Sequence, residues 1–282
     1  MKIVAFDIGG TDIKYGILEN GVMTNGSFAV RGGEGDPPLP ERIGKFVEMH
    51  KPDTVAVCAP GPFDFKNGIS LAEHKLAELY HVDLKSIILD GGASDVFFVS
   101  DSGAFLLGML YKIPEARVGR ACGVTIGTGL GYIASIDGRL WVDETEKPKN
   151  SLWCAPWKDG ICEEFVSATA IRKKAALLGF ENMSVRKLSF IAKSGNEKLL
   201  KLFDTMGEDL GSILAERSKT DCYERIFFGG NVTRSWELFK NGFERACSIP
   251  YTVTENADTA ALYGLFWATK TGKENIYTYE LL

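Results

Sequence analysis

The sequence predicts an α/β protein with two related halves, and three observations lead to this fold class. A buried strand, a glycine-rich turn and a second strand follow one another in residues 2–18, and Asn20-Gly21 then suits a hairpin turn. The same order recurs in residues 122–136, ahead of Asp137-Gly138. The length of 282 residues exceeds a typical single domain and suits two. We therefore expect two halves that face each other.

Composition and charge narrow the class of protein. With 45% hydrophobic and 24% charged residues the chain reads as a soluble globular protein. A formal net charge of −5 without a long cluster of Lys and Arg argues against nucleic acid as a partner. The start reaches Asp7 too soon for a signal peptide and no apolar run could cross a bilayer, so we expect a cytoplasmic protein without a membrane partner. Six cysteines without a CxxC pair are expected to be reduced and mostly structural.

The first glycine turn, Gly9-Gly10-Thr11, predicts an anion-binding site. A turn without Cβ atoms lets backbone N–H groups approach an anion. The carboxylate of Asp7, at the end of the preceding strand, can hold a metal ion or its waters. Gly127-Thr128-Gly129 repeats the turn in the second half. The alternative is that both are ordinary tight hairpins of an unrelated α/β protein.

The next segments alternate between helix, strand and loop. Residues 31–40 are rich in glycine and proline and form either a mobile flap or a plain surface connection. Apolar residues at helical spacing predict a helix over 41–51, which Pro52 stops. A core strand follows over 54–59, and the Pro-Gly-Pro backbone of residues 60–64 suits a ligand-binding loop and a plain turn equally.

A strand is expected to end at Ser100, with a helix beginning at Asp101. In isolation, an Asp at this place is most simply an N-cap. Before it, residues 76–88 read as a helix with loops. In the second half we expect one helix from Glu163 to residue 178 and an amphipathic helical region over 184–218.

Towards the carboxyl terminus, the strand over 224–229 runs into Gly229-Gly230-Asn231, where Asn231 is acceptable in a left-handed turn conformation.

Taken together, the two turns resemble the phosphate-1 and phosphate-2 segments of the actin-like ATPase superfamily, and within it the chain resembles the ROK family of sugar kinases and regulators. The resemblance runs from Phe6 to about Gly264. Residues 60–64 are similar to the family's "PGPVD" segment, residues 100–109 to "NDANAAALGE" and residues 226–233 to "VVLGGGVS". The resemblance implies a two-domain actin-like ATPase (ribonuclease H-like) fold with a nucleotide cleft between the domains. The domains would span 1–112 and 113–282, with the last helix packing back on the first domain.

The resemblance also implies ATP and Mg²⁺ as cofactors and a hexose or N-acylhexosamine-like sugar as the acceptor of the γ-phosphoryl group. Asp101 aligns with the family's catalytic base, and Asp7 is expected to hold Mg²⁺ directly or through water. The residues expected to bind the nucleotide are Asp7, Gly9, Gly10, Thr11, Lys14, Gly127, Thr128, Gly129, Gly229, Gly230 and Asn231. The residues expected on the sugar side are Gly61, Asp64, Ser100 and Glu163. We also expect a homodimer.

Several positions depart from the family pattern. Ser100 and Gly103 stand where the family has two Asn, the first of which contacts the sugar, so the acceptor can differ from glucose. Residues 142–167 contain no histidine, and neither the "ExGH" motif nor the "CxCGxxGC" zinc site is present. Only Cys154 coincides with a family ligand, which predicts no structural zinc because tetrahedral zinc needs four Cys or His ligands.

Glu163 aligns with a family Glu that binds sugar hydroxyls, and its alternative is a solvated charge in the first turn of a helix. Three tryptophans crowd the same segment and serve either sugar stacking or the core, namely Trp141, Trp153 and Trp157.

Two other functions remain open from the sequence. One is a non-catalytic regulator that binds a sugar or nucleotide. ROK repressors carry a helix-turn-helix ahead of the first phosphate turn, and because Asp7 is the seventh residue here, we expect no such domain. The other is a kinase of a non-sugar acceptor, which the missing "ExGH" motif leaves open.

Overall fold

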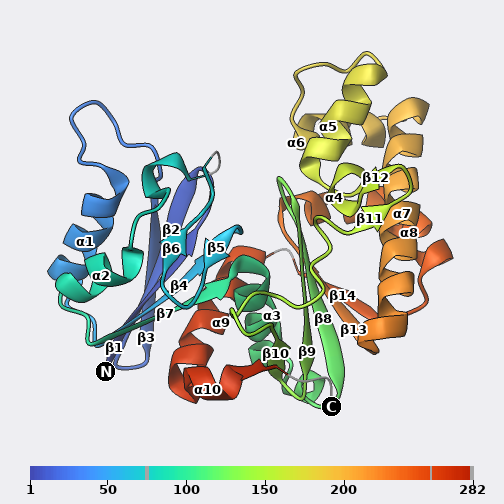
Figure 1. The fold of residues 1–282 in the computed structure, drawn as a ribbon. Helices are drawn as coiled ribbons and strands as arrows, with labels where there is room; N and C mark the ends of the chain where they lie inside the picture. The colour runs from blue at the N-terminus through green and yellow to red at the C-terminus, as the bar shows by residue number, and fades with distance from the viewer. Residues whose placement is uncertain (74–75, 255, 280–282) are drawn as a thin grey trace. The chain divides into compact units, whose positions relative to one another are not determined.

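A computed structural model describes residues 1–73, 76–254 and 256–279 of the chain (Figure 1). The chain divides into two compact units. The first comprises Met1–Glu115, Gly138–Lys149 and Asp258–Leu282, and the second comprises Ala116–Asp137 and Asn150–Ala257. Among the described residues, no helix combines the length and apolar character that crossing a membrane requires.

The first unit is built around a five-stranded mixed sheet with the order β3-β2-β1-β4-β7. Its strands are β1 (Lys2–Ile8), β2 (Asp12–Glu19), β3 (Val22–Ala29), β4 (Thr54–Ala59) and β7 (Asp95–Ser100). Two short pairs belong to the same unit, β5 (Phe63–Asp64) with β6 (Ile69–Ser70) and β10 (Arg139–Trp141) with β15 (Tyr277–Thr278). Its helices are α1 (Leu39–His50), η1 (Ala77–Leu79), α2 (Leu84–Asp90), α3 (Asp101–Lys112), α9 (Ala257–Thr271) and α10 (Lys273–Ile276).

The register of this sheet decides which side chains meet at its edge. Strands β1, β4 and β7 are parallel, with Asp7 opposite Cys58 and Ala59 opposite Ser100. The carboxyl ends of parallel strands lie at one edge of a sheet, and in open α/β sheets ligands bind beyond that edge. The segments that follow Ile8, Ala59 and Ser100 therefore emerge together.

Helices cover both faces of the sheet. Helix α1 confirms the helix predicted for 41–51; its buried residues Leu39, Ile43 and Val47 share a core cluster with Phe6. On the opposite face, Phe266 of α9 packs against Gly16 of β2, leaving less than 3 Å to a Cβ built on Gly16. Side chains alternate along a strand, so Tyr15 faces the α1 side, where its ring centroid lies 4.6 Å from that of Phe46.

The second unit contains four strands in the order β14-β13-β8-β9, of which the first three are parallel. Its strands are β8 (Arg120–Ile126), β9 (Leu130–Ile136), β13 (Arg225–Gly229) and β14 (Tyr251–Val253), with the short pair β11 (Pro156–Trp157) and β12 (Gly160–Ile161). Its helices are α4 (Cys162–Phe165), α5 (Ala168–Leu177), α6 (Val185–Lys193), α7 (Glu197–Asp221), η3 (Asn231–Leu238) and α8 (Lys240–Ala246). The short η2 (Pro114–Arg117) lies where the chain passes from the first unit to the second.

Several local predictions are confirmed and one helix is not. The hairpin turns have positive φ at both residues, 51° and 81° at Asn20-Gly21 and 48° and 78° at Asp137-Gly138. The single helix expected from Glu163 to residue 178 is wrong, because it consists of α4 and α5. The break arises at Ser167, whose hydroxyl caps α5 by accepting the N–H of Ala170 at 2.9 Å.

Candidate functional site

The first glycine turn leaves two backbone amides available. Gly9 N–H donates to the carbonyl of Asp12 at 3.0 Å, and a Cβ on Gly9 would lie 2.8 Å from that oxygen. A Cβ on Gly10 would meet nothing within 4 Å. Within the described part of the chain, the N–H groups of Gly10 and Thr11 have no hydrogen-bond partner. The turn thus offers amide donors beside open space, as an anion site requires.

Asp7 lies at the end of β1, directly before this turn. The thiol of Cys58 on the neighbouring strand donates to its Oδ1 at 3.3 Å. Burial raises the pKa of Asp7 to about 6; the Cys58 hydrogen bond and the charge of Lys14 oppose this shift, and the carboxylates of Asp258 and Asp101 add to it. Asp101, the predicted catalytic base, is thus near enough to Asp7 for their charges to interact.

Sequence reasoning missed two residues near Asp7, namely Asp258 and Cys58. Asp258, in the first turn of α9, forms an ion pair of 2.6 Å with Lys14, which was expected to bind the phosphates. Asp258 lies more than two hundred residues along the chain, and no motif signals it. Cys58 could have been found, because it occupies the strand that ends in the Pro-Gly-Pro segment, but a cysteine there reads as an ordinary core residue.

Asp101 is the first residue of α3 and is not its N-cap, so the alternative of a simple N-cap is wrong and the catalytic role stays a prediction. The cap is Ser100, whose Oγ accepts the N–H of Gly103 at 3.1 Å. Ser100 is also buried, so its hydroxyl oxygen is committed to the helix. Asp101 Oδ1 accepts the N–H of Ser102 at 2.6 Å.

The loop after β4 carries the other two sugar-side candidates of the first unit. Asp64 accepts hydrogen bonds from the backbone N–H and the side-chain amide of Asn67, at 3.1 and 2.8 Å. The hydrogen bond from the Asn67 side chain is the largest of the effects that hold the pKa of Asp64 below its usual range. Gly61 is exposed, and a Cβ there would meet nothing within 4 Å.

The second glycine turn, between β8 and β9, has every carbonyl bonded within its own unit. Gly127 O accepts from Ala168 N–H at 2.9 Å and Thr128 O accepts from Thr169 Oγ1 at 2.9 Å, both from α5. Gly129 O accepts from Gly127 N–H at 3.0 Å. In a trans peptide the C=O and the following N–H point in opposite directions. The N–H groups of Thr128 and Gly129 therefore point away from α5, and neither has a partner among the described residues.

Gly230 lies against the strand that leads into this turn. It has a φ of 96°, and a Cβ there would come within 2.5 Å of the backbone of Ile126. Parallel pairing sets Gly229 opposite Thr125. Gly229 and Gly230, expected to bind the nucleotide, thus lie beside the strand that leads into the second glycine turn. Gly230 supplies the positive φ of this turn, and Asn231 begins η3.

The carboxylate of Glu163 is partly buried and does not lie free in solvent. Its Oε2 accepts the N–H of Leu130, the residue directly after the second glycine turn, at 2.8 Å.

The three tryptophans differ in their surroundings. Trp141 is buried, Trp153 is 51% exposed, and the indole N–H of Trp157 donates to Asp209 at 3.2 Å.

The residues near the first glycine turn fit Mg²⁺ held by one carboxylate better than a metal ion held by several protein ligands. In the described ranges, no three His, Cys, Asp or Glu side chains group closely enough to hold a metal ion. Mg²⁺ in phosphoryl-transfer sites typically keeps several waters and takes only one or two protein carboxylates. Asp7, beside the free amides of the first turn, meets that requirement.

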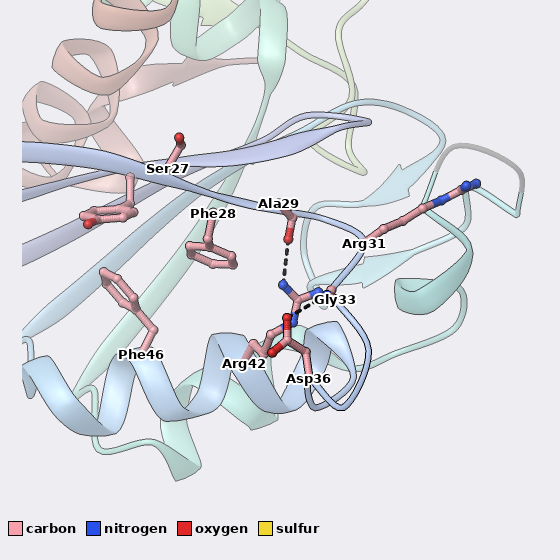
Figure 2. A pocket seen from close by; sticks show the side chains of 10 residues that line it. Ser27, Phe28, Ala29, Arg31, Gly33, Asp36, Arg42 and Phe46 are labelled. Atoms are coloured by element: carbon pink, nitrogen blue, oxygen red, sulfur yellow. Dashed lines mark hydrogen bonds between the residues drawn. The ribbon is translucent and has the colours of Figure 1, made fainter.

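A cavity of about 420 Å³ lies apart from these residues, between β3, α1 and the loop that joins them (Figure 2). Arg42 holds the loop by donating to the carbonyls of Pro37 and Ala29, at 3.0 and 2.6 Å. Figure 2 shows Phe28 and Phe46 facing the hollow, and none of the predicted site residues lines it.

Comparison with known proteins adds the family. The sequence model of the ROK family matches residues 3–267. A glucokinase of Thermotoga maritima is 22% identical over 267 residues, 84% of each chain. A beta-glucoside kinase of Klebsiella pneumoniae is 26% identical over 133 residues, so the match spans 46% of this chain and less than half, 45%, of that one.

Among solved structures, the ROK family glucokinase of Streptomyces griseus in complex with glucose and AMPPNP has a TM-score of 0.74 at 19% identity, covering 96% of this chain and all of that one. This likeness shows the fold and confirms the predicted α/β, actin-like ATPase class. Because the family match covers almost all of the 282 residues, the chain belongs to the ROK family.

Proposed function

We propose that this protein is an ATP-dependent kinase that transfers the γ-phosphoryl group of ATP to a hydroxyl of a hexose or N-acylhexosamine-like sugar. The observation that carries the proposal is the pair of glycine turns, each with two amide donors that no group in the described part of the chain uses. Two carboxylates at the edge of the first sheet, Asp7 and Asp101, accompany the first turn. The named relatives, which are sugar kinases, support the same function.

The amides suit the chemistry of phosphoryl transfer. Charge in the transition state spreads over the phosphoryl oxygens, so the protein acts mainly by positioning groups and balancing charge. Gly10, Thr11, Thr128 and Gly129 would donate N–H groups to phosphate oxygens, and Lys14 would add a positive charge. Mg²⁺ held by Asp7, directly or through water, would neutralise further charge on the phosphates.

Asp101 would take the proton from the attacking hydroxyl. A general base needs hydrogen-bond reach to that oxygen. Asp101 begins α3 at the edge where β1, β4 and β7 end, so an acceptor bound over the Gly61 loop would come close to it.

The test is acceptor-dependent ADP formation from ATP and Mg²⁺ with a panel of hexoses, N-acylhexosamines and polyols. Asp101→Asn should lower turnover by about two to four powers of ten, the usual size of a general-base contribution, with ATP affinity nearly unchanged. Glu115→Gln, at the edge of the first unit, serves as the matched control and should keep full turnover. Equal turnover in Asp101→Asn would refute the assignment of the base, and no ADP with any acceptor would refute the kinase.

One observation favours a second candidate, a kinase of a non-sugar acceptor. Three of the four sugar-side residues, Ser100, Asp64 and Glu163, already accept hydrogen bonds from protein N–H groups. ADP formed with other hydroxyl compounds and not with sugars would support this candidate. Binding of a sugar or nucleotide without ADP would instead support a regulator.

A further inference from the structure

The carboxylate of Glu163 lies directly over the second glycine turn. Besides accepting the N–H of Leu130, it occupies the position that a Cβ on Gly129 would take. The Leu130 N–H belongs to the same peptide unit as the Gly129 carbonyl, which accepts from Gly127. Glu163 therefore fixes the last peptide of the turn from the side opposite to that carbonyl.

The helices that carry Glu163 hold the rest of the turn. Ala168 and Thr169, in the first turn of α5, bind the carbonyls of Gly127 and Thr128. With Glu163 on Leu130, the segment from α4 to α5 contacts three successive peptide units. The direction of the two free amides thus depends on contacts from this single segment.

The backbone beneath Glu163 is itself held in place. Ser167 Oγ donates to the carbonyl of Glu163 at 2.8 Å while its oxygen caps α5. The β11–β12 hairpin, which leads into α4, is tied to α7 through the buried Asp209, which accepts from the indole of Trp157 and from Lys158. Glu163 is thus presented from a fixed support, as a positioning group requires.

We propose that Glu163 is a positioning residue for nucleotide binding: it holds the second glycine turn so that the N–H groups of Thr128 and Gly129 face the phosphates. This inference rests on the proposed function, because it takes the phosphates of ATP as the anion that the turn binds.

The experiment measures the affinity of AMPPNP by calorimetry, without acceptor, for the full chain and its variants. Glu163→Ala should weaken binding on the order of tenfold, the usual effect of losing a hydrogen bond to a charged group. Glu163→Gln has a side-chain oxygen that can accept the Leu130 N–H, so it should keep most of the wild-type affinity for AMPPNP. The matched control is Glu164→Ala, which removes the neighbouring carboxylate that accepts from Ile161 N–H at 3.1 Å and should leave the affinity unchanged.

A second measurement does not depend on nucleotide. Amide hydrogen exchange at Leu130 should become faster in Glu163→Ala and stay slow in Glu163→Gln. Gly129→Ala should weaken AMPPNP binding strongly in the wild-type background and much less in Glu163→Ala, because the carboxylate that the new methyl would meet is gone.

The outcomes separate the two claims. If the wild-type chain does not bind AMPPNP, the proposed function fails. If it binds and Glu163→Ala binds equally well while the acceptor KM rises, Glu163 is an acceptor ligand and the inference is wrong. Additive effects of Gly129→Ala and Glu163→Ala would also overturn it.

Discussion

Asp7 is a half-buried acid whose charged form the fold disfavours. Its pKa of about 6 lies above the ordinary value of 3.8 because desolvation outweighs the Cys58 hydrogen bond and the charge of Lys14. A folded-state pKa above the unfolded value stabilises the protein fully below about pH 4, and this contribution is lost as the pH rises through 6. A bound cation would reverse the preference by favouring the carboxylate.

Asp7→Asn should therefore remove a pH dependence. Between pH 4 and pH 7, the free energy of unfolding of the wild type relative to this variant should fall by on the order of 2 kcal/mol. Urea unfolding at several pH values, without nucleotide, measures this difference. A constant difference across the range would contradict the raised pKa.

In the first glycine turn, one glycine is needed for folding and the other for the proposed phosphate binding. Gly9 must lack a Cβ because the carbonyl of Asp12 leaves only 2.8 Å. Gly10 has open space at the same position, so the structure itself does not require a glycine there. The proposed function does require one, because a side chain would hold the phosphates away from the amides.

The two glycines should therefore respond in opposite ways. Gly10→Val should fold with nearly unchanged stability and weaken AMPPNP binding by about tenfold or more. Gly9→Ala should lower the free energy of unfolding by about 1–3 kcal/mol, because the backbone must shift. Urea unfolding and nucleotide titration of both variants provide the comparison. Normal nucleotide affinity in Gly10→Val would show that the turn does not bind phosphate.

At the scale of the whole molecule, the first unit draws on three separate stretches of the chain. Helix α9 joins it through close backbone contact with α3. A Cβ on Gly108 would overlap the carbonyl of Ala260, and a Cβ on Gly264 would overlap that of Ala104. The domain limits expected from the sequence, 1–112 and 113–282, the homodimer and the cytoplasmic location stay predictions.

Gly108→Ala tests the close packing of α3 and α9, because that packing predicts whether the free energy of unfolding falls or rises. In the interior of an unpacked helix, Gly→Ala stabilises by about 1 kcal/mol. Here the methyl would meet backbone and the two helices would have to separate, so we expect a destabilisation of about 2 kcal/mol or more. Urea denaturation gives the value, with Gly127→Ala as a control whose Cβ meets nothing within 4 Å. A stabilised Gly108→Ala would contradict the close packing.

The sequence by itself determined the features that depend on neighbours in the chain. Strand 54–59, the helix after the Gly/Pro-rich loop and both hairpin turns follow from local spacing and backbone preference. Local reasoning failed where two local options compete, as at Ser100 and Asp101, since either side chain can cap α3.

Only the tertiary structure decided which partner each polar group meets. The pairing of Lys14 with Asp258, the contact of Cys58 with Asp7 and the position of Glu163 over Gly129 join residues that are distant in sequence. Motifs indicated that Lys14 and Glu163 bind ligands, but a motif records residue types and spacing. The partner of a side chain depends on how strands and helices pack, and this packing follows from the burial of the whole apolar surface rather than from any short segment.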